Sequence, residues 1–257
     1  MQLATWNVNG LNSRLEFLLH WLRERRPDVV GLQELKLEDD RFPRLELKAA
    51  GYGCLVHGQK AWNGVAILSR EEIQPIQSGL PGQDDLGARL VSAATAGITF
   101  TTVYVPNGKS VAHEDYPRKL EWLDALAQWF RDTQDPTEPH VLCGDFNVAP
   151  SALDTFDEAR LAGKVHHTEA ERDRLRALSD WGFVDAFRSR YPDRRQYSWW
   201  DYRGGAFHRN LGLRIDLVYA TAPALARMQE IEVDREYRKK KDGLIASDHA
   251  PLILTLE

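Results

Sequence analysis

The chain has 257 residues, of which 43% are hydrophobic and 28% charged. This composition is ordinary for a globular protein and excludes a disordered chain. No apolar run is long enough to cross a bilayer, and residues 1–10 lack a basic stretch followed by an apolar segment, so we expect a cytoplasmic protein without membrane association. The formal net charge of −5 argues against a surface that coats nucleic acid all over, but it allows a local basic face.

Two cysteines and one basic cluster give weaker indications. Cys143 lies in the apolar run 141–143, which reads as a buried strand, so a disulfide with Cys54 is not expected and a reducing compartment fits. The cluster of Arg235 with 238–241 suits either a solvated loop or a contact to phosphate.

The predicted elements alternate along the chain, beginning with a strand. Three elements carry helix signals. Ser13 and Glu16 form a capping-box pattern before a leucine stripe, a second apolar stripe spans 116–131, and a third helix begins with the Thr168 capping box and ends at 181–182. The apolar runs between and beyond the helices predict strands at 3–6, 29–32, 64–68, 98–105, 141–143, 213–219 and 252–256.

Strands therefore outnumber helices, and no linker or repeat divides the chain. In the run 213–219, apolar Leu213 and Ile215 alternate with Arg214 and Asp216, which predicts one buried and one partly polar face. This pattern favours one domain over 1–257, with two sheets packed face to face and helices outside.

One theme recurs: a predicted strand ends and at once delivers a carboxylate, amide or imidazole. The segments that do so are 5–10, 32–34, 144–147, 214–216 and 247–251. We expect their side chains to meet at one end of the sandwich. Oxygen ligands without a cysteine cluster suit Mg²⁺ or Mn²⁺, and Glu34, Asp248 and the Asn7 amide are candidate ligands.

The other polar residues suggest phosphate chemistry. An Asp216 carboxylate beside His249 would fix its tautomer and favour its charged form, which suits a phosphate contact. Asp145 and Asn147 are two apart, so in an extended strand they would point to the same side, one orienting a water and the other contacting phosphoryl oxygens. The chain has no Gly-rich phosphate loop, nucleophile elbow or Cys-x-x-Cys pair, which leaves hydrolysis on a metal.

Taken together and in this order, the segments 6–11, 31–34, 144–147, 212–216 and 247–251 resemble the exonuclease III family within the endonuclease/exonuclease/phosphatase superfamily. The similarity spans nearly the whole chain. Residues 104–108 resemble the family's phosphate-binding tyrosine segment, and residues 197–203 resemble the loop that meets an abasic sugar. Both segments are typical of the DNA-repair branch.

This resemblance implies an α/β fold, a four-layer α/β sandwich in which two packed mixed β-sheets are flanked by helices. It implies an enzyme that uses Mg²⁺, with Mn²⁺ as a substitute, to cut double-stranded DNA 5′ to abasic sites. It also implies 3′–5′ exonuclease activity and the removal of 3′ phosphates and other blocking groups. By default we expect a monomer that is cytoplasmic and nucleoid-associated.

The resemblance further implies roles for individual residues. Those implied for catalysis are Tyr104, Asp145, Asn147, Asp216 and His249. Those implied for the metal are Asn7, Glu34, Asp145, Asn147 and Asp248. Those implied for DNA contact are Asn107, Trp199, Trp200, Arg203, Asn210, Leu213 and Ile215. For Trp199 and Trp200, a stacking surface is favoured over a place in the core.

One segment departs from the family: His166 and His167 stand where a Ser-Phe-Leu-Pro stretch is usual. They form either a plain helix entrance capped by Thr168, which we favour, or a border of the DNA pocket that alters the balance of activities. The alternatives left open are a specialised DNA 3′-phosphatase, an inositol or lipid phosphatase, and a DNA-binding module without catalysis.

Overall fold

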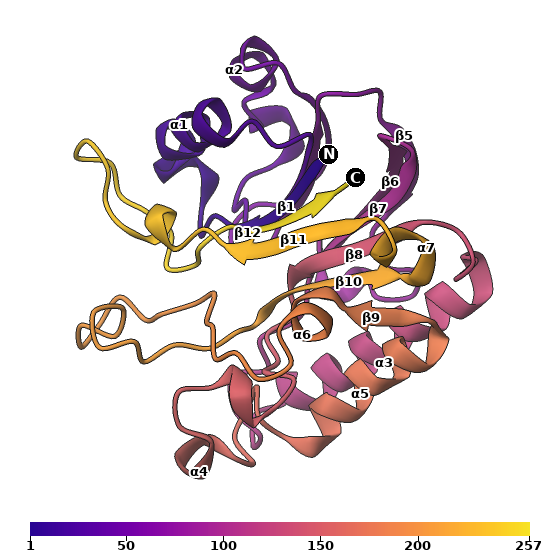
Figure 1. Cartoon of the computed structure of the whole chain (residues 1–257), viewed down its shortest axis with the longest axis vertical. Helices are drawn as coiled ribbons and strands as arrows, with labels where there is room; N and C mark the ends of the chain where they lie inside the picture. Colours follow the sequence, from indigo (N-terminus) through magenta and orange to yellow (C-terminus); the bar gives the residue numbers. More distant parts are fainter.

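Two six-stranded mixed sheets pack face to face in the computed structural model, which describes residues 1–257 (Figure 1). The first sheet has the order β11-β12-β1-β2-β4-β3, and the second has the order β5-β6-β7-β8-β10-β9. The strands of the first sheet are β1 (Gln2–Asn7), β2 (Val29–Gln33), β3 (Gly53–His57), β4 (Val65–Ser69), β11 (Met228–Val233) and β12 (Leu252–Leu256). Those of the second are β5 (Gln74–Ser78), β6 (Leu90–Thr95), β7 (Ile98–Tyr104), β8 (His140–Asp145), β9 (Phe183–Asp185) and β10 (Asp216–Thr221).

Helices cover the outer face of each sheet. The helices of the chain are α1 (Leu15–Arg25), α2 (Arg44–Ala49), α3 (Asp115–Thr133), α4 (Glu158–Leu161), α5 (Glu169–Trp181), α6 (Ala186–Arg190) and α7 (Ala222–Leu225), and not all of them lie on these outer faces. Short 3₁₀ turns occupy Leu11–Ser13, Asp39–Arg41, Asp84–Leu86, Ala152–Asp154 and Arg235–Arg238. In Figure 1, α1 and α2 lie outside the first sheet, and α3 and α5 lie outside the second. The four-layer sandwich is therefore confirmed.

Three apolar clusters hold these layers together. Trp21 packs between α1 and the first sheet, Trp122 and Phe130 pack between α3 and the second, and Val29 and Val141 lie between the sheets. Burial of such apolar surface supplies most of the favourable free energy of folding. No helix of the structure reaches the length and apolarity of a membrane span.

Helix starts were predicted with mixed success. The Thr168 side chain accepts from the Glu171 backbone N–H and the Glu171 carboxylate accepts from the Thr168 N–H, which confirms that capping box. The box at Ser13 is wrong: residues 11–13 form a 3₁₀ turn, because Leu11 N–H bonds back to the Leu35 carbonyl at 3.0 Å, and α1 starts only at Leu15.

The strand predicted at 213–219 is wrong in its first half. β10 begins at Asp216, while Leu213 makes isolated bridges to Thr155 and Trp199. The expected polar face does not meet solvent either, because Arg214 is fully buried and its guanidinium pairs with Asp154 at 2.7 Å.

Candidate active site

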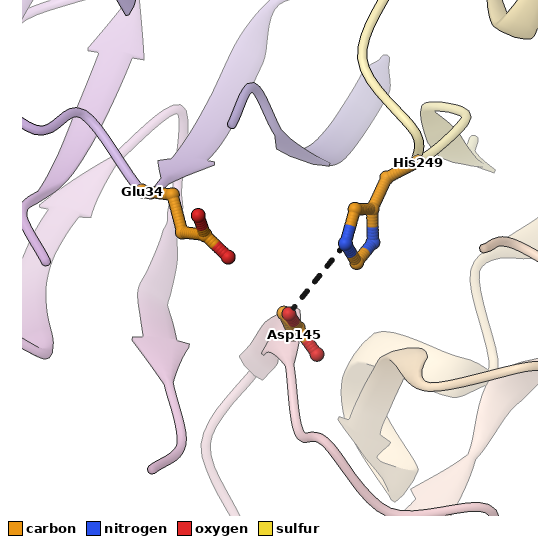
Figure 2. A group of neighbouring side chains, drawn as sticks. All are labelled: Glu34, Asp145 and His249. Atoms are coloured by element: carbon orange, nitrogen blue, oxygen red, sulfur yellow. Dashed lines mark ion pairs between the residues drawn. The ribbon is translucent and has the colours of Figure 1, made fainter. Parts of the chain in front are cut away.

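The polar residues at the strand ends lie together at one end of the sandwich. β1 runs parallel to β2, and β8 lies antiparallel to β10, so Asp145 at the end of β8 faces Asp216 at the start of β10 in register. Ligand atoms of Glu34, Asp145 and His249 fall within 4.8 Å of one another (Figure 2). Glu34 and Asn147 have positive φ, 53° and 51°, which turns the chain sharply just beyond β2 and β8.

Asn7 bridges the two carboxylates of this cluster. Its Nδ2 donates to Glu34 Oε1 and to Asp145 Oδ2, each at 2.9 Å. Lys36 Nζ lies 2.9 Å from Glu34 Oε2. Two carboxylates this close are the donor set that a hard divalent cation prefers, so Glu34 and Asp145 fit such an ion. The Asn7 Oδ1 accepts from the Asn9 N–H at 2.9 Å, so ligation through this oxygen requires the amide to turn.

Asp145 is almost completely buried, and burial raises the pKa of its carboxyl to about 7. The charge of His249 opposes this rise, while Asp216 and Glu34 add to it. A bound cation would favour the ionised form. With a cation bound, Asp145 is therefore an ionised carboxylate, the form that can accept a proton.

His249 is held by Asp216 on its other side. Its Nδ1 lies 2.8 Å from Asp216 Oδ2, and its Nε2 lies 3.9 Å from Asp145 Oδ2. Burial disfavours the charged imidazolium, but Asp216 outweighs it, aided by Asp145 and Asp248, and raises the pKa of His249 to about 10. A protonated imidazole is a donor and not a metal ligand. His249 therefore suits an anionic phosphoryl oxygen.

Two asparagines and a tyrosine border the cluster. Asn147 N–H donates to Asp145 Oδ1 at 2.9 Å, its Nδ2 donates to the Val105 carbonyl at 3.0 Å, and its Oδ1 accepts from Asn107 Nδ2 at 3.2 Å. The expected extended strand through 145–147 is wrong because β8 ends at Asp145. Burial, with Glu34 and Asp145, keeps the pKa of Tyr104 well above its usual value, so its phenol remains a donor.

Asp248 lies outside the cluster. Its Oδ1 accepts from Asn9 Nδ2 at 2.9 Å, and its Oδ2 accepts from Trp199 Nε1 at 3.0 Å. Its two oxygens are thus held by neutral donors, and the structure does not bring it to the metal-capable pair.

The two tryptophans differ. Trp199 is half-buried, and its backbone bridges both Leu213 and His249. Trp200 is fully buried and packs edge-on to Phe207 at 5.1 Å, so the expectation that it contacts DNA is wrong. Its ring lies in a small apolar cluster. Burial of its Nε1 is tolerated because this nitrogen donates to Asn210 Oδ1 at 3.4 Å.

The remaining candidates for DNA contact also differ in burial. Leu213 and Ile215 are buried, at 5% and 4% exposure, and the backbone of Leu213 bridges that of Trp199. The Arg203 side chain is 90% exposed and pairs with Asp201 at 3.0 Å, which leaves it free to meet a ligand.

Several residues that lie at or near the site are not among the site residues predicted from the sequence. Arg238, which had suggested a phosphate contact, is buried: its Nε donates to the Asp248 carbonyl and its Nη2 to the Trp200 carbonyl, both at 3.0 Å. Arg89 lies over the Tyr104 ring at 4.9 Å. Lys36 stands two residues after Glu34, and this spacing is the one hint the sequence offers.

His166 and His167 lie at the entrance of α5, as the capping pattern predicted, but His166 also reaches the site. Its Nδ1 contacts the Asn147 carbonyl, which requires a proton on that nitrogen because a carbonyl only accepts. Burial, with the charge of Lys119, lowers the pKa of His166 to about 3. His167 is 3% exposed.

With this geometry described, the comparisons with known proteins are specific. Residues 4–249 match the endonuclease/exonuclease/phosphatase family. Exodeoxyribonuclease III of Haemophilus influenzae is 34% identical, covering 98% of each chain. An AP endonuclease from Archaeoglobus fulgidus superposes with a TM-score of 0.96 at 36% identity, covering 100% of this chain and 99% of the other. A 3′ phosphatase from Neisseria bound to a product DNA hairpin superposes with a TM-score of 0.95 at 38% identity and the same coverage.

The matches cover the whole sandwich and include every segment that forms the cluster. The chain therefore belongs to the endonuclease/exonuclease/phosphatase family, and it is a hydrolase of the exodeoxyribonuclease III and AP endonuclease type.

Proposed function

We propose that this protein is a Mg²⁺-dependent DNA repair phosphodiesterase that cuts double-stranded DNA 5′ to abasic sites. The observation that carries the proposal is the buried cluster of Glu34, Asp145 and His249, in which two carboxylates fit a cation and an imidazolium faces them. The A. fulgidus and H. influenzae relatives support DNA as the substrate. The cellular setting that follows is the cytoplasm at the nucleoid, with the chain acting as a monomer.

In this proposal Glu34 and Asp145, with the Asn7 amide turned, hold the cation. Mg²⁺, or Mn²⁺ in its place, would act as a Lewis acid and stabilise charge that develops on the phosphoryl oxygens. Asp145 in its ionised form orients the attacking water and accepts its proton. His249 donates from Nε2 to a non-bridging oxygen, since its Nδ1 is occupied by Asp216.

Tyr104, Asn107 and Asn147 complete the phosphate site. Each presents a neutral donor beside Asp145, and neutral donors stabilise an oxyanion without the cost of burying further charge. Water then attacks phosphorus in line as the bond to the 3′ oxygen breaks; this oxygen takes a proton from solvent water to give a 3′-hydroxyl, and the phosphate stays on the 5′ side of the abasic sugar.

In this proposal the lesion is selected by the apolar side chains of Trp199, Leu213 and Ile215, and the backbone of Trp199 bridges both Leu213 and His249. An abasic nucleotide can leave the helix without unstacking a base, so a small apolar pocket can accept it and refuse a normal nucleotide. In this proposal specificity comes from shape, with 3′–5′ exonuclease and 3′-phosphatase activities using the same metal site.

A second candidate is a DNA 3′-phosphatase that has lost incision at internal abasic sites. The contact of His166 with the Asn147 carbonyl favours it, because it brings to the site an imidazole from the segment that departs from the family's usual Ser-Phe-Leu-Pro stretch. The similarity to the Neisseria 3′ phosphatase, at 38% identity, points the same way.

The deciding experiment uses two labelled duplexes, one with an internal abasic-site analogue and one with a 3′-phosphate at a nick. Each is incubated with Mg²⁺ and with EDTA. Incision 5′ to the lesion that EDTA stops supports the abasic endonuclease. Removal of the 3′-phosphate alone supports the second candidate, and cleavage of neither duplex contradicts both.

A further inference from the structure

A buried ion pair lies directly behind the phosphate site. Lys119 on α3 and Glu171 on α5 are both 0% exposed, and the Lys119 ammonium is paired with Glu171 Oε1. No step of the proposed reaction uses either side chain.

The ammonium group has three hydrogens and three oxygen acceptors, and it also lies 3.5 Å from His166 Nδ1. Besides Glu171 the acceptors are the Asn147 carbonyl at 2.7 Å and the Asn107 carbonyl at 3.3 Å. Asn107 and Asn147 are the two asparagines whose side chains bond to each other beside Asp145. The buried Lys119 ammonium thus donates hydrogen bonds to the backbone of both loops that carry phosphate donors.

Glu171 connects the ion pair to a third segment, the entrance of α5. Its Oε1 accepts from the His166 N–H at 3.0 Å, and its Oε2 accepts from the Thr168 N–H at 3.0 Å. His166 in turn contacts the Asn147 carbonyl that Lys119 also holds. The pair therefore ties α3, the entrance of α5 and the two asparagine loops into one unit.

A pair of this kind gives little net stability. Desolvation of two charges offsets their attraction, and apolar or neutral replacements of a whole buried pair are often tolerated. Asn147, by contrast, sits at a left-handed φ of 51°, a conformation that an asparagine adopts only at some cost in free energy. Fixing its carbonyl fixes the plane of that peptide and hence the direction of its side chain.

We propose that Lys119 and Glu171 are positioning residues, which set the backbone of Asn107 and Asn147 so that both side chains meet the scissile phosphate. This inference rests on the proposed function, since it assigns the asparagines to the phosphate. It concerns their placement and not their chemistry.

The test is the double variant Lys119→Met/Glu171→Gln, which leaves no buried charge unpaired and keeps an acceptor for the Thr168 cap. The matched control is Arg174→Met, which removes the other ion pair between α3 and α5, Arg174 Nη2 to Asp124 Oδ2 at 3.0 Å. Single-turnover cleavage at saturating DNA, the DNA dissociation constant and the thermal midpoint are measured for each. In free protein, ¹⁵N–¹H spectra follow the side-chain amides of Asn107 and Asn147.

We expect the double variant to remain folded and to bind DNA within about threefold of wild type. It should cleave ~10- to 100-fold more slowly, because the asparagine side chains are then misplaced relative to the phosphate. The asparagine amide resonances should shift, and Arg174→Met should change neither rate nor these resonances. In an Asn147→Ala background, the double variant should add less than about threefold, since the group it positions is gone.

Wild-type rate and unmoved resonances in the double variant would overturn the inference, as would an undiminished rate loss in the Asn147→Ala background. If the double variant does not fold, Glu171→Gln alone is measured in the same way, and an unchanged rate with unmoved resonances would again overturn it. Failure of the wild type to cleave DNA contradicts the proposed function instead, and the spectra then still report whether the pair sets the asparagines.

Discussion

The two ends of the sandwich both gather carboxylates, yet they are built differently. The end opposite the active site holds a cavity of about 890 Å³, lined by Asp28, Glu71, Glu72 and Glu138 among others. Of these, the three glutamates are exposed, and no hydrogen bond joins one to another. At the active-site end, Asp145 and Asp216 are buried and the polar groups bond to one another.

Backbone conformation separates the two ends as well. At the opposite end, Ala96 and Gly97 have φ of 51° and 74° in the tight turn between β6 and β7, where such angles are ordinary for a hairpin. At the active-site end, positive φ falls on Asn9, Glu34 and Asn147, whose side chains all join the polar network. A site is thus marked by burial and mutual bonding of its polar groups, and not by the size or acidity of a cavity.

The largest contrast between the ends should come from Asp145→Asn, with Glu138→Gln as the matched change at the other end. Loss of the carboxylate that accepts the proton should lower the cleavage rate by ~10³-fold while abasic-DNA binding is retained. Glu138→Gln should alter neither the rate nor, beyond about 0.5 kcal/mol, the free energy of unfolding. Rate and binding are measured separately, and an equal loss of both in Asp145→Asn would refute its role.

Glu34→Gln tests whether the cation binds at the active-site end and not at the opposite end. A neutral amide attracts Mg²⁺ less than a carboxylate, so the Mg²⁺ concentration for half-maximal cleavage should rise by ~10-fold or more. Titration of cleavage with Mg²⁺ measures this. Glu71→Gln, on the cavity at the far end, is the control, and a rise there equal to that in Glu34→Gln would contradict the assignment.

Asp216→Asn tests, through the pH dependence of cleavage, whether His249 acts as a charged donor. Asp216 is the main charge that raises the pKa of His249 to about 10, so wild-type activity should persist until His249 loses its proton near that pH. Without the Asp216 carboxylate the pKa of His249 falls, and the alkaline limb of the pH–rate profile should move to lower pH. An alkaline limb that stays in place would show that His249 does not act as a charged donor.

The smallest effect is expected for Trp199→Phe, which keeps a ring but removes the donor to Asp248 Oδ2. Loss of one hydrogen bond to a charged group costs about 1.5–3 kcal/mol, part of which will appear as reduced stability. We expect cleavage at abasic sites to fall by no more than ~10-fold, with 3′-phosphate removal less affected. Equal losses on both substrates would argue that Trp199 does not line the sugar pocket.

The sequence predicts most central strands of the fold but misses the edge strands and the central strand β6. β1, β2, β8 and β12 are buried on both faces and read as short apolar runs. The edge strand β5, with the sequence QPIQS, is largely exposed and lacks such a run. β11 is missed because a bulge between Met228 and Glu230 breaks its alternation.

The site divides in a similar way. Asn7, Glu34 and Asp145 are found because each lies at the end of a recognisable strand, and His249 is found because it shortly precedes the strand β12. Lys119, Arg214 and Arg238 are missed because a charged residue in a sequence reads as solvated. Only the packing of distant segments shows that the three are buried.

Location of the bound cation tests the central claim most directly. Crystals soaked in Mn²⁺ give an anomalous signal that places the ion without reference to activity. We expect a peak between the carboxylates of Glu34 and Asp145, and its loss in Glu34→Gln. A peak among Asp28, Glu71 and Glu72 instead, with none at Glu34, would contradict the account.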